Sequence, residues 1–304
     1  VELVCYFAVG GRSEPLEYSG ISHFLEHMLF RGTAEFANST ELERAFEEIG
    51  GAVNASTDVE TTCFHSRVHP DYLERGVELF ASMLLRPCFN EIDTERKIIL
   101  EEAREDFNER GEQVNLDNLM VELLWPAHPL GASLIGSPET LNAIGRKQLE
   151  AYYRDWYHPG NLVICACGAV DPEVLRLATE REFGDWQPRT PLALVPLKES
   201  QQWVPRSCWV QDSDSQVSFQ LAFRLPGRND ERTMAIRLLR RILGWGAGAR
   251  LPLRLREELG LTYSVEVSCL LLDDTGYLAI DTAVAPDNLC AAVAEVLAIF
   301  KTLA

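Results

Sequence analysis

Two histidines four residues apart, His23 and His27 in the run HFLEH, are the side chains best suited to chemistry in this chain. The apolar pattern around them predicts a short helix over residues 21–30. Positions i and i+4 of a helix lie one above the other, so both imidazoles point to one side, with Glu26 beside them. Imidazole nitrogens suit zinc, and a catalytic zinc takes three protein ligands and one water. The run therefore predicts a zinc site with His23 and His27 as ligands and Glu26 as general base.

Such a site needs a third protein ligand from a nearby rigid element. The helical pattern over residues 91–110 is the obvious source, because it is long and rich in carboxylates. It carries nine acidic residues between Glu91 and Glu112, so composition alone does not identify the ligand.

The reversed order HxxEH is the signature of the inverted zincins. Around it the sequence resembles the pitrilysin/insulinase family of zinc metallopeptidases, and especially the processing-peptidase-like members. The resemblance covers essentially the whole chain and rests on the segments GISHFLEHMLFRGT, EEIGGAVNASTDVETTCF, ERKIILEEAREDFN and GARLPLRLREELGLTYSV. It implies an α+β fold of two related α/β domains, each a mostly antiparallel sheet packed with helices, which together form half of a clamshell.

The resemblance also implies the carboxylates of the site. Matching ERKIILEE to the family pattern places the metal-binding glutamate at Glu102 and a supporting acid at Glu95, seven residues earlier on the same helix face. A one-residue slip in that match would select Glu101 instead. Consecutive helix positions differ by about 100° in direction, so Glu101 and Glu102 cannot both face the metal.

Substrate-binding residues follow from the same resemblance. The strand from Ala52 to Cys63 is similar to the family's edge strand, where an extended peptide binds by strand addition, and Asn54, Ala55 and Ser56 are the candidates there. Arg256 and Tyr263 match an arginine and a tyrosine that position substrate or stabilise the developing oxyanion. Because they are remote in sequence from HFLEH, they could complete the site of the same chain or of a partner.

The domain organisation follows from a break in pattern between Gln187 and Arg206, which holds four of the fifteen prolines. We expect a zinc-binding catalytic domain at 1–190, a linker at 191–206 and a second, related domain at 207–304. A faint echo, EEIGGAVNAS beside EELGLTYSVE, supports the relationship. Because the chain opens inside a strand-like run and stops inside a helical pattern, we expect a truncated second domain and a longer protein.

Local patterns predict the elements around the motifs. A helix begins near Thr40, which we expect to cap it with Glu43, and another begins at Pro172 with Asp171 as its cap. The alternating residues 52–68 predict a strand or hairpin. Further helices are predicted at 71–85, 91–110, 116–124 and 146–157.

Composition limits the function. The chain has 304 residues, with 28 Lys plus Arg against 46 Asp plus Glu, a net charge of −18. Nucleic acid and anionic lipid surfaces are therefore poor partners, and no apolar run is long enough to span a membrane. The compartment stays open, with cytoplasm slightly favoured over periplasm or organelle matrix.

The sequence thus predicts a zinc-dependent endopeptidase with one Zn²⁺ per active site, acting on peptides or unfolded protein segments. A homodimer, or a heterodimer with a related subunit, is expected from the resemblance. The alternative is a non-catalytic family member that serves as a structural or partner-binding subunit. Natural substrate and cleavage preference are not predicted.

Overall fold

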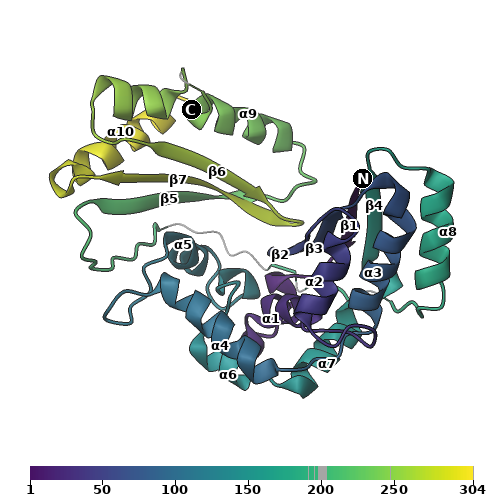
Figure 1. Cartoon of the computed structure of the whole chain (residues 1–304). Helices are drawn as coiled ribbons and strands as arrows, with labels where there is room; N and C mark the ends of the chain where they lie inside the picture. Colours follow the sequence, from purple (N-terminus) through teal and green to yellow (C-terminus); the bar gives the residue numbers. More distant parts are fainter. Residues whose placement is uncertain (191, 195, 198–203, 247, 304) are drawn as a thin grey trace. The chain divides into compact units, whose positions relative to one another are not determined.

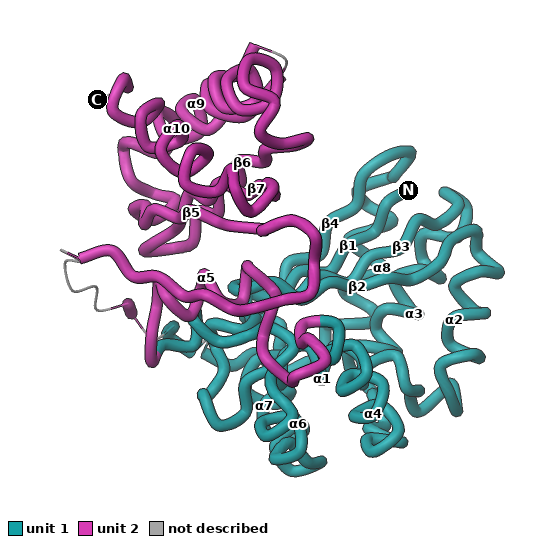
Figure 2. Tube along the Cα trace, turned by 90° about the vertical axis from the view of Figure 1, so that its left-hand side faces the viewer, with its two compact units in different colours: residues 1–105, 128–195 teal, residues 106–127, 196–304 magenta. Residues whose placement is uncertain are grey.

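A computed structural model of the chain describes residues 1–190, 192–194, 196–197, 204–246 and 248–303. The chain forms two compact units, one of residues 1–105 and 128–195 and the other of residues 106–127 and 196–304 (Figure 2). Residues 106–127 belong to the second compact unit, and the predicted domains 1–190 and 207–304 stay predictions. Within the predicted linker 191–206, residues 191, 195 and 198–203 lie outside the described residues.

The sheet of the first unit has the strand order β2-β3-β1-β4, and its neighbouring strands are antiparallel. The strands are β1 (Glu2–Phe7), β2 (Val53–Thr57), β3 (Thr62–Arg67) and β4 (Leu162–Cys167). Successive side chains of a strand point to opposite faces. In β1, Leu3, Cys5 and Phe7 are accordingly buried, whereas the residues between them are partly or fully exposed. One face of the sheet therefore faces the core of this unit.

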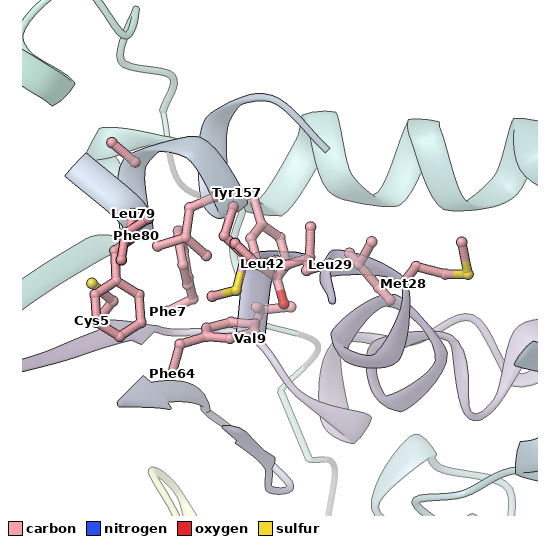
Figure 3. Packing of buried hydrophobic residues seen from close by; sticks show 14 of the residues in the cluster. Cys5, Phe7, Val9, Met28, Leu29, Leu42, Phe64, Leu79, Phe80 and Tyr157 are labelled. Carbon is pink, nitrogen blue, oxygen red and sulfur yellow. The ribbon is translucent and has the colours of Figure 1, made fainter. Parts of the chain in front are cut away.

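Helices of the first unit bury a continuous apolar core together with that face. They are α1 (Ile21–Leu29), α2 (Ser39–Glu47), α3 (Leu73–Leu85), α4 (Ile92–Ala103), α6 (Pro138–Ala143), α7 (Arg146–Trp156) and α8 (Pro172–Phe183) (Figure 1). In the core, the ring of Tyr157 lies 4.3 Å from that of Phe7, and Phe64 and Phe80 are also fully buried (Figure 3). This core holds α1 against the sheet.

The predicted hairpin is confirmed as β2 and β3, paired from Val53 opposite Ser66 to Thr57 opposite Thr62. Among the described residues, β2 is an outer strand of the sheet. Its side chains alternate, with Asn54 exposed and Ala55 half-buried. An outer strand leaves backbone N–H and C=O groups available for pairing.

The second unit is built on the antiparallel sheet β5-β7-β6. Its strands are β5 (Val217–Pro226), β6 (Val265–Leu271) and β7 (Thr275–Val284), and its helices are α5 (Leu116–Leu124), α9 (Thr233–Gly244), a π-helix (Pro252–Glu258) and α10 (Leu289–Lys301). The helices α9 and α10 lie on one face of the sheet and α5 on the other (Figure 1). The expected α+β class, with antiparallel sheets packed with helices, is confirmed in both units.

Helix ends show where local patterns suffice. The predicted cap Asp171 is confirmed, because its side chain accepts a hydrogen bond from the backbone N–H of Glu173. The prediction for α2 was wrong, since Asn38 and not Thr40 is its cap and accepts from the N–H of Glu41. Both are good N-cap residues, and the earlier one starts the helix. The helix predicted over 91–110 ends at Ala103.

None of the helices in the described part of the chain is both long and apolar enough to span a membrane.

Candidate metal centre

Helix α1 carries the run HFLEH, and the opposite face of this helix is buried in the core. Phe24, Leu25 and Met28 are fully buried, which fixes the rotation of the helix about its axis. His23 and His27 then lie on the less buried face of the helix. Their rings meet edge to face, with centroids 4.5 Å apart. The i, i+4 spacing thus places two imidazoles together, as the sequence predicts.

Glu102 reaches the two histidines from α4, which packs against α1. Its carboxylate oxygens lie 3.8 Å from His23 Nε2 and 3.9 Å from His27 Nε2, and the two Nε2 atoms are 3.1 Å apart. One possible ligand atom from each residue therefore lies within 4.8 Å of the others. A tetrahedral zinc with bonds of about 2.0–2.2 Å separates its ligand atoms by roughly 3.3–3.6 Å. The spacing of the three side chains fits zinc.

Glu101, the alternative ligand, points elsewhere. Its carboxylate pairs with Arg104 Nη1 at 2.5 Å on the exposed side of α4. The structure therefore brings Glu102, and not Glu101, to the histidines.

Glu95 lies seven residues before Glu102 on the same face of α4. Its carboxylate contacts the Nδ1 edge of the His27 ring. Its Oε1 is 2.7 Å from His27 Nδ1, and its Oε2 accepts from Arg31 Nε. The Arg31 guanidinium also faces Glu91 at 3.7 Å. A carboxylate at Nδ1 favours the tautomer with the proton on Nδ1, which directs the Nε2 lone pair towards the site. Glu95 thus orients a candidate ligand.

Glu26 is buried beside the histidines and hydrogen-bonded to the sheet. Thr57 Oγ1 of β2 donates to Glu26 Oε2 at 2.5 Å. Burial raises the pKa of Glu26, and the hydrogen bond from Thr57 only partly opposes it. A carboxylate with a raised pKa is better matched to general acid–base chemistry near neutral pH.

The pKa values of the two histidines shift in opposite directions because their surroundings differ. Burial, with the neighbouring His27, lowers the pKa of His23 to about 4. Burial also acts to lower the pKa of His27, but the hydrogen bond and charge of Glu95, with Glu26 and Glu102, outweigh it and raise that pKa. Burial acts to raise the pKa of Glu95, and its bonds to His27 and Arg31 lower it overall. Neutral imidazole and ionised carboxylate are the forms that bind zinc.

A cleft of about 470 Å³ opens beside this cluster. Glu26, His27 and Glu95 line one side of it, and Asn54 and Ala55 of β2 line another. Ser56 is exposed on the same strand. The strand predicted to hold substrate therefore borders the cleft that contains the candidate general base.

Arg256 and Tyr263 lie in the second unit. The guanidinium carbon of Arg256 is 5.8 Å from the centroid of the Tyr263 ring, and Tyr263 is 86% exposed. Arg256 Nε also pairs with Glu257 at 3.0 Å. The two predicted residues are thus neighbours, and the tyrosine hydroxyl is open to solvent.

Sequence reasoning missed two residues that contact the candidate site, Arg31 and Thr57. Arg31 follows His27 by four positions, so helix spacing could have indicated it. Nothing in the sequence distinguishes Thr57 from the neighbouring threonines, because its contact with Glu26 depends on how β2 packs against α1.

Comparison with known proteins supports a relationship over the whole chain. A family model described as "Insulinase (Peptidase family M16)" matches residues 1–137, and one described as "Peptidase M16 inactive domain" matches residues 143–304. An uncharacterized zinc protease of Mycobacterium tuberculosis (strain ATCC 25618 / H37Rv) is 32% identical over 289 residues, which are 93% of this chain and 65% of that protein. The chain therefore spans less than two thirds of the length of this relative.

Solved structures agree on the fold. A protease from Helicobacter pylori superposes with a TM-score of 0.90 at 23% identity, covering 99% of this chain and 74% of that one. Pitrilysin superposes with a TM-score of 0.69 at 21% identity, covering 99% of this chain and 33% of that one. The chain therefore has a pitrilysin-like fold.

Proposed function

Because this chain belongs to the M16 (insulinase) peptidase family, we propose that it acts as a zinc-dependent endopeptidase on peptides or unfolded protein segments. The observation that carries the proposal is the convergence of His23, His27 and Glu102 beside the buried Glu26. In this proposal His23, His27 and Glu102 bind one zinc ion. When bound, zinc would supply a Lewis acid that polarises a carbonyl and lowers the pKa of water to about 7.

The protein's own groups supply the proton transfers. Glu26 accepts a proton from the attacking water and passes it to the leaving amine, which needs a carboxylate within hydrogen-bond reach of both. Thr57 holds one oxygen of Glu26, so the other can face the reacting atoms. Glu95 keeps His27 in the tautomer that presents Nε2.

Substrate holding is proposed to use the main chain of β2. An extended peptide that pairs with Asn54, Ala55 and Ser56 would lie along the cleft that Glu26 lines. Main-chain pairing gives affinity that depends little on sequence. Arg256 and Tyr263 are proposed to donate to the oxyanion or to the substrate, in the same chain or in a paired one. We also propose that the protein pairs with a second copy or a related subunit.

A non-catalytic role is the second candidate, because residues 143–304 match the model described as an inactive domain. Against it, the first unit keeps the proposed ligands, the supporting Glu95 and the candidate base. A subunit without chemistry has no need of a buried glutamate such as Glu26 beside two histidines.

A digest of a peptide library by the complete protein tests the proposal. Cleavage should occur, stop on addition of a zinc chelator and return when zinc is restored. Absence of any chelator-sensitive cleavage, in a preparation that contains zinc, would support the non-catalytic role instead.

A further inference from the structure

Glu14 is a buried acid outside the proposed catalytic group, and it contacts the helix that carries that group. It lies between two 3-10 turns, Gly11–Ser13 and Leu16–Tyr18, and is 4% exposed. Its Oε2 accepts from the backbone N–H of Gly20 at 2.7 Å, and its Oε1 accepts from the N–H of Ser22 at 2.8 Å. Both carboxylate oxygens are therefore bound to the first turn of α1.

The start of α1 has no cap of its own. Its N-cap residue, Gly20, has a φ of 93° and no side chain that could accept a hydrogen bond. A Cβ atom there would lie 2.3 Å from the carbonyl oxygen of Ile135, so the close approach of that backbone requires glycine. The N–H groups of a first helical turn need an acceptor from elsewhere when they are buried. Glu14 supplies it from six positions upstream of Gly20.

The Ser22 side chain ties the same turn to a second helix. Its Oγ lies 2.8 Å from the Tyr152 hydroxyl of α7. His23, the first candidate ligand, follows Ser22 directly in the chain. The hydrogen bond from the Ser22 N–H to Glu14 therefore acts one residue away from that ligand. Arg31 and Glu95 hold the other end of the motif. The helix is thus fixed at both ends, by Glu14 at its start and by an ion pair after its last turn.

We propose that Glu14 is a positioning residue of the metal site, which fixes the first turn of α1 so that His23 presents Nε2 beside His27 and Glu102. This inference rests on the proposed zinc function. A negative charge at a helix N-terminus is favourable, and here it offsets part of the cost of burial. Burial nevertheless raises the pKa of Glu14 to about 7, with the hydrogen bonds from Ser22 and Gly20 opposing the shift. Because burying this carboxyl group costs free energy, we infer that its two hydrogen bonds to α1 have a specific role.

The test compares Glu14→Gln with Glu17→Gln in the complete protein. Glu17 lies three residues later, in the 3-10 turn Leu16–Tyr18, and is exposed, so it is a matched control for the change of charge. In Glu14→Gln the amide nitrogen faces one of the two backbone N–H donors, and one hydrogen bond is lost. Zinc affinity, measured by chelator competition, should fall by about 10-fold or more, as for other residues that orient ligands. The kcat for a peptide should fall while KM stays within about twofold, because no substrate contact changes.

Two further readouts separate positioning from general stability. Amide hydrogen exchange should show that Gly20 and Ser22 lose protection in Glu14→Gln, whereas the amides of β1 and β3 keep theirs. The absorption bands of the cobalt-substituted protein should shift, because they report ligand geometry. Wild-type zinc affinity and cobalt bands in a folded Glu14→Gln variant would overturn the inference.

If Glu14→Gln fails to fold, Glu14→Asp carries the same test. It keeps the charge on a shorter arm, so it should bind zinc more weakly than wild type, with KM unchanged. A folded Glu14→Asp variant with wild-type affinity would also overturn the inference. The zinc and exchange measurements do not depend on turnover. Failure of the wild-type protein to cleave peptides would therefore count against the proposed function and not against the role of Glu14.

Discussion

His27 Nδ1 lies 2.7 Å from Glu95 Oε1, and this contact decides which nitrogen of His27 faces the candidate metal centre. Arg31 holds the second oxygen of Glu95, so the acid bridges a histidine of α1 and an arginine just beyond the helix. The orientation of one candidate ligand thus depends on a side chain of α4.

Replacing Glu95 by Gln should weaken zinc binding by about 10- to 100-fold, since groups that orient metal-binding histidines typically contribute this much. The variant also leaves Arg31 without its main partner. Chelator competition measures the affinity. Glu91→Gln is the control, because its carboxylate is exposed and lies 3.7 Å from Arg31. Equal affinities for the two variants would contradict the role of Glu95.

A second pair of variants decides between neighbouring glutamates. Glu102→Gln should purify without stoichiometric zinc, because a neutral amide replaces an anionic ligand. Glu101→Gln should keep its zinc, since Glu101 pairs with Arg104 on the exposed side of α4. Elemental analysis measures both. Zinc loss from Glu101→Gln alone would mean that the third ligand has been misassigned.

Much of the fold could be predicted from local patterns. The helices that carry HFLEH and the acidic run, the hairpin after α2 and the cap at Asp171 all follow from spacing and residue type. The packing of residues 106–127 with the second unit could not be predicted, because it depends on contacts between distant segments. The start of α2 was wrongly predicted at Thr40 for a local reason, because Asn38, two residues earlier, is also a good N-cap residue and caps the helix in the structure.

In the candidate site, too, some residues could be predicted from the sequence and others could not. Helix spacing predicts that His23 and His27 lie together, and the family resemblance selects Glu102. The contacts of Thr57 with Glu26 and of Glu14 with α1 join elements that are far apart in sequence or lie in loops. Such contacts are set by tertiary packing, so one sequence does not reveal them.

The stability of the second unit should depend on pH because the folded state changes the pKa of Asp281. Burial raises the pKa of Asp281 to about 6; the hydrogen bond from Gln220 opposes this shift, and the charges of Asp117 and Glu266 add to it. The folded-state pKa lies above the ordinary aspartate pKa of 3.8, so the folded protein binds the proton more tightly than the unfolded chain does. The stabilisation is therefore complete below about pH 4 and is lost as pH rises through about 6.

Urea unfolding across this range measures the effect. The wild type should lose stability relative to Asp281→Asn as pH rises from about 4 to 7, because the variant has no carboxyl to ionise. Asp287→Asn, at an exposed position, should follow the wild type. A constant difference between wild type and Asp281→Asn at all these pH values would refute the assignment.

Tyr263 is expected to act on the reaction and not on the metal. Tyr263→Phe should keep its zinc and lower kcat by about 100-fold, the scale for loss of one oxyanion donor. Steady-state kinetics with one peptide, beside zinc analysis, measures both. Tyr72→Phe, another exposed tyrosine, is the control and should behave as wild type. Unchanged kcat in Tyr263→Phe would remove Tyr263 from the proposed mechanism.

The most direct measurement compares zinc content and peptide hydrolysis in one preparation of Glu26→Gln. The account predicts zinc at the wild-type level, because Glu26 is not a ligand, together with a loss of turnover of about 10²- to 10⁴-fold, the usual contribution of a general base. Wild-type turnover by a zinc-loaded Glu26→Gln variant would contradict the account.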